Sequence, residues 1–332
     1  MGERAIASAM TVTRDELYAS PDHYLHSFEG DAAVFVPMDR AAYHRSIFLD
    51  GRISPAANGA MRLPVAALTG AVRPPSTGWI FHVAHCGSTL LARALDDPAM
   101  NLVLREPLAL RQLAFGPADG RLETVAAMVS KRYRDDLPTI VKANVPVNFL
   151  LPRLAAHDPQ ARAIFLYLGL RDYLTAILRS DNHRDWLRRV TMQLAPHLGD
   201  LSGLSDTERA AALWLAQVSA YATAADAMPQ ARSLDAELFF AEPARVLAAA
   251  AGHFAVPLTS AEIAQRVSGP LFSTYSKNPE VAFDNDARLA RRRDLERELS
   301  GELGEAERWV AGRGDGAGVR ALARLATIGL AD

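Results

Sequence analysis

Short apolar runs alternate with helical patterns along most of the chain. Residues 79–84 form an apolar run of strand length, which breaks at the small-residue turn 85–88. Apolar side chains then recur at helical spacing from Ser88 to Asp96, which predicts a strand, a tight glycine turn and a helix in that order. Further strands are predicted at 101–104, 139–142 and 162–168, with a weaker fifth strand within 232–239.

The segments between these strands carry helical periodicity. Strands that alternate with helices are typical of a parallel sheet covered on both faces, and segment 162–168 is apolar enough to be buried on both sides. The predicted fold class is therefore α/β, a three-layer fold in which helices flank a parallel β-sheet. Helices are predicted at 108–115, 122–134, 145–154, 171–180, 186–194, 206–227, 242–254, 261–267 and from 286 to about 310.

The first quarter of the chain lacks the regular alternation of strands and helices. It predicts a short capped helix start at 13–17, a strand at 33–38 stopped by its proline, and a short helix at 39–48. A proline-rich loop, 73–78, then leads into the central strand. We expect residues 1–75 to form an N-terminal accessory segment and residues 76–332 to form the main domain.

Composition limits the function classes. The 332 residues carry a net charge of −2, so no global basic field recruits nucleic acid or an anionic membrane. A single cysteine, Cys86, excludes an internal disulfide framework and favours a reducing, cytoplasmic location. No run reaches the roughly 18 apolar residues of a membrane span, and the N-terminus lacks a signal-peptide core. We expect a cytoplasmic protein without nucleic-acid or membrane partners.

The glycine turn suits an anion. Gly87 lets a phosphate approach the backbone, and Ser88 and Thr89 add hydroxyl donors beside the free N–H groups of the first helical turn. An ordinary capped turn has the same composition, and both interpretations stay open at this point. The nucleotide-hydrolase loop does not fit, because Ser88 stands where that motif requires lysine. This disfavours an ATPase or kinase of the usual kind.

Polar residues follow four of the predicted strands. In an open parallel sheet, ligands bind at the carboxyl ends of the strands, so these residues are expected to share one rim. Solvated polar turns would give the same pattern. The residues are 85–89 after the first strand, Arg105 and Glu106 after the second, Lys142 and Asn144 after the third, and Arg171 and Asp172 after the fourth.

These landmarks resemble the sulfotransferase family that uses 3′-phosphoadenosine-5′-phosphosulfate (PAPS). Segment 84–89 is similar to the family's loop P-[KR]-[SAC]-G-[ST]-[ST], and segment 142–146 to its K-T-H-x-P strand end. Arg171 and the later Ser180 resemble the Arg and Ser that hold the 3′-phosphate. Segment 235–247 resembles its acidic-aromatic stretch before a helix opened by Glu-Pro. The resemblance covers about residues 79–258 and implies a sulfotransferase-like P-loop domain.

The resemblance also implies an activity, which is transfer of a sulfuryl group from PAPS to a hydroxyl or amine of a small-molecule or glycan acceptor. No metal is expected, because His183 and His197 lack a second ligand at metal spacing, and a monomer or homodimer is expected. The acceptor pocket is expected from segments 108–134, 183–200 and 265–285, with Lys277 covering it or reaching the nucleotide. The candidate catalytic residues are His85, Glu106 as base and Lys142 as second cation. The candidate PAPS-binding residues are His85, Cys86, Gly87, Ser88, Thr89, Arg171 and Ser180.

Three features depart from the family pattern. His85 replaces the loop Lys or Arg, and Asn144 replaces the histidine of K-T-H. Ser180 lies nine residues after Arg171, where the family usually has eight, and Arg179 holds that place. Two alternatives therefore remain, namely a small-molecule kinase or other phosphate-handling P-loop enzyme, and a non-catalytic nucleotide-binding descendant of the fold. Cys86 is expected as a small filler rather than a nucleophile. The arginine run at 288–293 is expected to be a solvated helix face with i,i+4 pairs.

Overall fold

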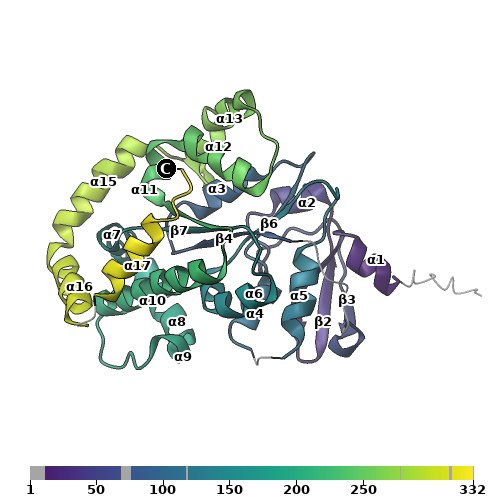
Figure 1. The fold of residues 1–332 in the computed structure, drawn as a ribbon, viewed down its shortest axis with the longest axis horizontal. Coiled ribbons are helices and arrows are strands. Elements are labelled where there is room, and N and C mark those ends of the chain that lie inside the picture. The colour runs from purple at the N-terminus through teal and green to yellow at the C-terminus, as the bar shows by residue number, and fades with distance from the viewer. Residues whose placement is uncertain (1–11, 69–75, 117–118, 277, 314–315, 332) are drawn as a thin grey trace, which may run out of the picture.

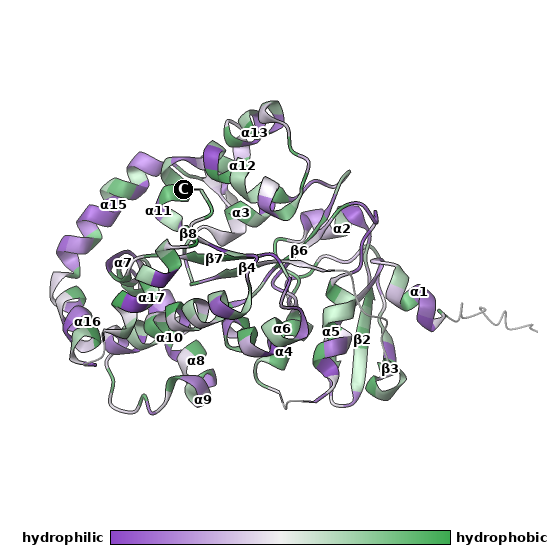
Figure 2. Ribbon diagram, in the orientation of Figure 1, coloured by the Kyte–Doolittle hydropathy of each residue, from purple (hydrophilic) through white to green (hydrophobic). Residues whose placement is uncertain are grey.

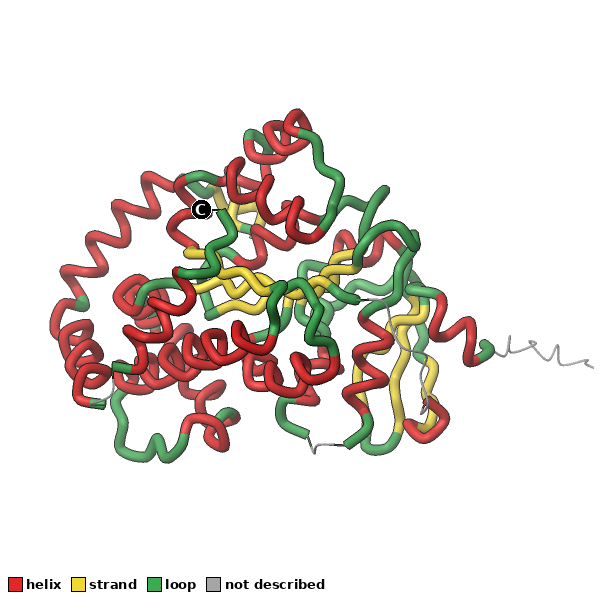
Figure 3. The backbone as a smooth tube through the Cα atoms, in the orientation of Figure 1, coloured by secondary structure: helices red, strands yellow, loops and turns green. Residues whose placement is uncertain are grey.

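A five-stranded parallel sheet forms the centre of the protein (Figures 1 and 3). The computed structural model describes residues 12–68, 76–116, 119–276, 278–313 and 316–331. The strand order is β5-β6-β4-β7-β8, and every neighbouring pair is parallel. The strands are β4 (Gly78–His82), β5 (Leu102–Arg105), β6 (Thr139–Lys142), β7 (Ala163–Tyr167) and β8 (Ala231–Asp235).

Helices cover both faces of this sheet, as its apolar strands require. Every residue of β4, β5 and β6 is buried, which leaves no solvated face. Helices α3 (Ser88–Leu95) and α12 (Pro243–Phe254) pack together on one side of the sheet. On the other side, α10 (Asp206–Ala227) packs on η2 (Val145–Leu150) and α6 (Leu151–His157) (Figure 1). The predicted α/β class with a helix-flanked parallel sheet is confirmed.

A small antiparallel sheet lies beside the central one. It has the order β1-β2-β3, and β1 packs on helices α4 and α5. Its buried side chains belong to the same hydrophobic core as the central sheet, and the boundary predicted at residue 75 stays a prediction. The elements are α1 (Arg14–Ala19), β1 (His23–Glu29), β2 (Ala32–Pro37), α2 (Arg40–Arg45), β3 (Met61–Pro64), η1 (Val65–Leu68), α4 (Leu108–Leu113) and α5 (Arg121–Val129).

The last helices of the chain lie near strand β8, which α17 contacts. The single helix predicted from 286 to about 310 is wrong, because two helices, α15 (Asn285–Glu298) and α16 (Ser300–Gly312), meet at Leu299. The hairpin of β9 (Thr274–Tyr275) and β10 (Asn278–Ala282) was also not predicted. The remaining helices are α7 (Leu170–Leu178), α8 (Asp181–Gln193), α9 (Ala195–Leu198), α11 (Ala236–Ala241), α13 (Ser260–Val267), α14 (Pro270–Ser273) and α17 (Ala317–Ala326).

Hydropathy follows this layering. Polar residues predominate on the outlying α15, and apolar ones on the central strands (Figure 2). Within the residues that the structure describes, no helix has both the length and the apolarity needed to cross a bilayer.

Candidate functional site

The turn between β4 and α3 has the geometry of an anion-binding loop. Helix α3 begins at Ser88, and Gly87 caps it with a left-handed backbone, φ 79°. A Cβ atom at position 87 would lie 2.8 Å from the ring of Phe240. Both the dihedral angle and the space therefore require glycine. His85 adopts φ 62°, an uncommon conformation for a residue with a side chain.

The side chains of Cys86, Ser88 and Thr89 are buried at this turn. Thr89 is 1% exposed, and its Oγ1 atom makes no hydrogen bond within the described part of the chain. Buried polar groups in proteins are nearly always hydrogen-bonded, so this hydroxyl is available to a water, an ion or a ligand. The Cys86 thiol is also buried, and it donates to the Val83 carbonyl with an Sγ–O distance of 2.8 Å. This contact turns Cys86 inward, as expected of a packing residue.

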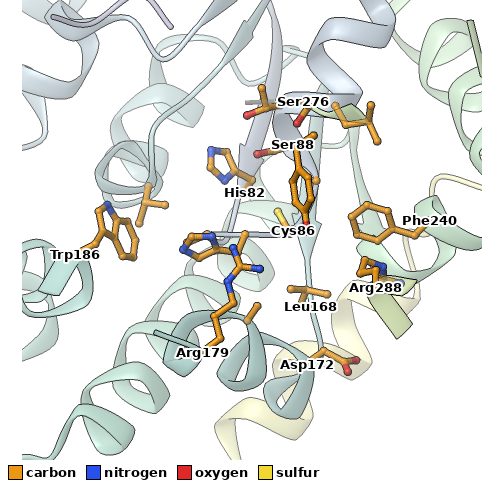
Figure 4. Close-up of a pocket in the computed structure, with 18 of the residues that line it drawn as sticks. His82, Cys86, Ser88, Leu168, Asp172, Arg179, Trp186, Phe240, Ser276 and Arg288 are labelled. Carbon is orange, nitrogen blue, oxygen red and sulfur yellow. The ribbon is translucent and has the colours of Figure 1, made fainter. Parts of the chain in front are cut away.

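A cavity of about 540 Å³ opens in front of the turn (Figure 4). Residues that follow β4, β5, β6 and β7 all line it, including Glu106, Asn144 and Leu168. Each of the three segments expected to form an acceptor pocket also contributes. Lys277, expected to act here too, lies outside the described residues. The sequence analysis missed one wall, formed by the N-terminal residues Phe48, Asp50 and Arg52.

Glu106 and Lys142 form an ion pair at the ends of neighbouring strands. Lys142 is fully buried and is not among the residues that line the cavity, whereas the Glu106 side chain is 17% exposed and lines it. Glu106 has a left-handed backbone, φ 58°, and its N–H donates to the Lys142 carbonyl, with N–O 2.8 Å. The N–H bond and the ion pair together fix the direction of the carboxylate. Strained backbone of this kind is concentrated at functional sites.

Arg105 does not reach the rim, contrary to expectation. It is 1% exposed and pairs with Asp96, with Nη1–Oδ2 2.6 Å. Its guanidinium also donates to the carbonyls of Tyr43 and Ser46. These partners come from the N-terminal segment, so Arg105 fastens that segment to the central sheet.

Arg171 also lies away from the cavity. Its side chain is half exposed and pairs with Glu307 of α16, with Nη1–Oε1 2.6 Å. Because side chains three and four residues apart share a helix face, only one face of α7 and its C-terminal cap can line the cavity. That face carries Asp172, Thr175, Ala176 and Arg179.

Arg179 is the cation that α7 directs toward the loop (Figure 4). Its Nε and Nη2 atoms lie 3.1 and 2.9 Å from Nε2 of His183. Nε2 must accept from these donors, so the proton of the neutral ring is on Nδ1, which lies 2.6 Å from Ser180 Oγ. The His183 ring packs against the His85 ring with 4.5 Å between centroids and a tilt of 46° between the ring planes. Ser180 is not among the lining residues, so it reaches the loop through His183.

Burial lowers the pKa of Arg179, and the neighbouring Arg291 lowers it further, although Tyr275 opposes both. Low dielectric and a second cation both disfavour positive charge. Binding of an anion between these arginines would relieve that repulsion. The region is therefore electrostatically suited to phosphate.

Helix α15 forms a further wall of the cavity, and the expected solvated arginine face is wrong for Arg288 and Arg292, which are mostly buried, whereas Arg291 is exposed. The lining residues lie at the spacing i, i+3, i+4, i+7, which defines one helix face. An apolar residue, Leu295, shares this face with three arginines, and this was the sequence signal that the face points inward. Arg288 binds Glu237 in a bidentate ion pair with distances of 2.7 and 2.9 Å. The residues are Arg288, Arg291, Arg292 and Leu295.

The arginines of α15 change the pKa values of the carboxylates that face them. Burial alone would raise the pKa of Glu237, but Arg288 and Arg292 outweigh it and hold that pKa below its ordinary value. Burial raises the pKa of Asp172, with Arg292 opposing and Glu237 adding to the rise. The Arg288 guanidinium also lies 4.2 Å from the centroid of Phe240. The ring therefore packs between Gly87 and α15.

Among the described residues, no three His, Cys, Asp or Glu side chains are grouped to hold a metal ion.

Comparison with known proteins finds likeness only among solved structures. Neither a protein-family model nor a curated protein matches the chain. The chain is similar to a sulfotransferase from Alicyclobacillus acidocaldarius, with 12% identity over 71% of this chain and 95% of that one, and a TM-score of 0.42. It is also similar to the sulfotransferase domain from the curacin biosynthetic pathway, with 12% identity over 69% of this chain and 99% of that one, and a TM-score of 0.39. A function must therefore be argued from the residues of the cavity.

Proposed function

We propose that this chain transfers a sulfuryl group from PAPS to a hydroxyl or amine of a small-molecule or glycan acceptor. One observation carries the proposal: the glycine turn, with the unpaired hydroxyl of Thr89, and the fixed carboxylate of Glu106 face the same cavity. The first is suited to bind an anionic donor, and the second is suited to remove a proton from an acceptor. Group transfer needs both in one enclosed space.

The cavity residues fit a PAPS-type donor. Gly87 leaves room at the N-terminus of α3, an eight-residue helix whose dipole favours an anion. Thr89 Oγ1 is a buried donor in need of an acceptor. Arg179 and Arg291 supply positive charge to a second phosphate. In this proposal Arg179 takes the role that the sequence suggests for Arg171, and Ser180 acts on the donor only by holding His183.

Glu106 is proposed as the general base. As the acceptor oxygen forms its bond to sulfur, the bond from sulfur to the bridging oxygen of the donor breaks, and the acceptor proton passes to the Glu106 carboxylate. Lys142 holds that carboxylate in place from its buried side. His85 lies in the turn beside the donor, where its protonated form would offset charge on the leaving phosphate.

Calorimetric titration with 3′,5′-adenosine bisphosphate tests this proposal, with ATP as the comparison ligand. We expect the bisphosphate to bind more tightly than ATP. Arg179→Ala should weaken this binding at least tenfold, and Arg171→Ala serves as a matched control that leaves it unchanged. Binding of ATP alone would favour the phosphate-handling alternative. Binding of the bisphosphate without any transfer from PAPS across a broad acceptor panel would favour the non-catalytic alternative.

A further inference from the structure

The end of the cavity around Glu106 is built largely by the N-terminal segment. The guanidinium of Arg52 stacks 3.8 Å from the centroid of Phe48, and its Nη2 atom lies 4.0 Å from Glu106 Oε2. Asp50 and Arg111 also line the cavity. We call this region, defined by Phe48, Asp50, Arg52, Glu106 and Arg111, the acceptor end.

The acceptor end and the buried Lys142 that pairs with Glu106 together carry three cations and two carboxylates. Arg52 binds Asp50 through two side-chain hydrogen bonds of 2.9 and 2.6 Å, and Glu106 pairs with Lys142. Arg111 remains as the third cation. Among the described residues, its guanidinium donates one hydrogen bond, of 3.2 Å, to the side-chain carbonyl of Gln193. One positive charge at this end is therefore not neutralised by a hydrogen-bonded carboxylate.

Helix α8 sets the distance from the turn to this charge. Trp186 packs against His85, with 5.9 Å between ring centroids, and Gln193 contacts Arg111. Gln193 lies seven residues after Trp186, a rise of roughly 10 Å along the helix. Val190 lines the cavity between them. An acceptor at Glu106 would therefore have apolar walls beside it and a guanidinium beyond them.

From this arrangement we infer that the acceptor carries a carboxylate on a ring, with Arg111 as its counter-ion and the apolar walls against the ring. One guanidinium presents two parallel N–H donors, a geometry that matches a carboxylate. The identification of the bound molecule as the acceptor rests on the proposed function. The carboxylate site itself requires only Arg111 and its surroundings.

Titration with 4-hydroxyphenylacetate and with its neutral amide, 4-hydroxyphenylacetamide, tests the site in the full chain without any transfer reaction. We expect the acid to bind at least tenfold more tightly than the amide. Arg111→Gln should abolish this preference, and Arg111→Lys should keep part of it, which guards against a folding defect in the first variant. Arg297→Gln is the control, because that side chain is 79% exposed on α15.

Equal binding of acid and amide, binding of neither, or a preference that persists in Arg111→Gln would each overturn the inference. Binding of 3′,5′-adenosine bisphosphate is measured separately on the same samples. If the bisphosphate fails to bind while the acid preference depends on Arg111, the carboxylate site stands and the proposed function fails.

Discussion

The ring of Phe240 occupies the space that a side chain at position 87 would need, 2.8 Å from the position of a Cβ atom. Gly87→Ala should therefore strain the backbone and force the ring aside. Gly30 is a matched control, because its φ of 59° is also left-handed but nothing lies within 4 Å of its Cβ position. We expect Gly30→Ala to lower the free energy of unfolding by about 1–2 kcal/mol. Gly87→Ala should lower it by about 1–3 kcal/mol more.

Urea unfolding measures both variants, and calorimetry with 3′,5′-adenosine bisphosphate measures the loop. Gly87→Ala should weaken bisphosphate binding, and adding Phe240→Leu should recover part of the lost stability. Equal destabilisation by the two alanine variants would show that Phe240 leaves room for a side chain at position 87.

Removal of the Glu106 carboxylate should stop proton transfer without weakening donor binding. We expect Glu106→Gln to reduce kcat by about 100-fold or more, the range typical of a lost general base. The substitution also leaves the buried Lys142 ammonium without its counter-ion, which costs about 3–5 kcal/mol of stability. The assay is release of 3′,5′-adenosine bisphosphate from PAPS in the presence of acceptor.

The double variant Glu106→Gln/Lys142→Met separates these two effects. It should regain much of the stability lost in Glu106→Gln, because the uncompensated charge is gone, and it should remain inactive. Recovery of activity together with stability would mean that Glu106 is structural.

His183 and Arg179 are expected to act as one unit in donor binding, because His183 accepts from two atoms of the Arg179 guanidinium. His183→Ala should weaken bisphosphate binding, though less than Arg179→Ala does. In the double variant the two losses should not add, since a residue that orients Arg179 has no effect once Arg179 is gone. Strictly additive losses, measured by calorimetry, would mean that His183 does not act through Arg179.

Lys131 should make stability depend on pH. Its ammonium group is buried and donates to the carbonyls of Leu17 and His23. Burial lowers its pKa to about 7, with Asp22 opposing. The unfolded chain, with an ordinary lysine pKa near 10.4, then binds more protons than the folded chain between about pH 7 and 10. Stability should rise with pH across this window, by up to about 1.4 kcal/mol per unit.

Urea unfolding of the wild type and of Lys131→Met at pH 7, 8 and 9 checks this expectation. The wild type should gain stability relative to the variant as the pH rises. A difference between the two proteins that stays constant over this range would show that Lys131 keeps its proton in the folded state.

The elements predictable from sequence are those that local signals specify. The apolar run of β4, the turn at Gly87 and the helix from Ser88 are adjacent in the chain, and the structure has them as predicted. Glu106 and Lys142 were expected at one rim of the sheet, and the pairing of β5 with β6 brings them together there. In these cases, proximity in the sequence or in the sheet was sufficient to predict which residues lie together.

The sequence of a helix does not by itself determine which of its faces points toward the cavity. Arg171 and Arg179 lie on the same helix pattern, and packing of α7 on α10 and α16 decides which of them faces the cavity. Likewise, the inward turn of Arg288 depends on Glu237, some fifty residues earlier, and the burial of Arg105 depends on carbonyls of residues 43–46. Charge patterns alone could not separate these arginines from solvated ones.

The cavity draws its walls from both ends of the chain, from Phe48 near the beginning to Leu295 near the end. During synthesis the glycine turn and the Glu106 strand emerge early, but the wall from α15 is translated last. A ribosome-bound or prematurely terminated chain that stops before this helix would carry Glu106 and lack Arg288, Arg291 and Arg292. The complete wall of the cavity therefore forms only in chains that have been translated through α15.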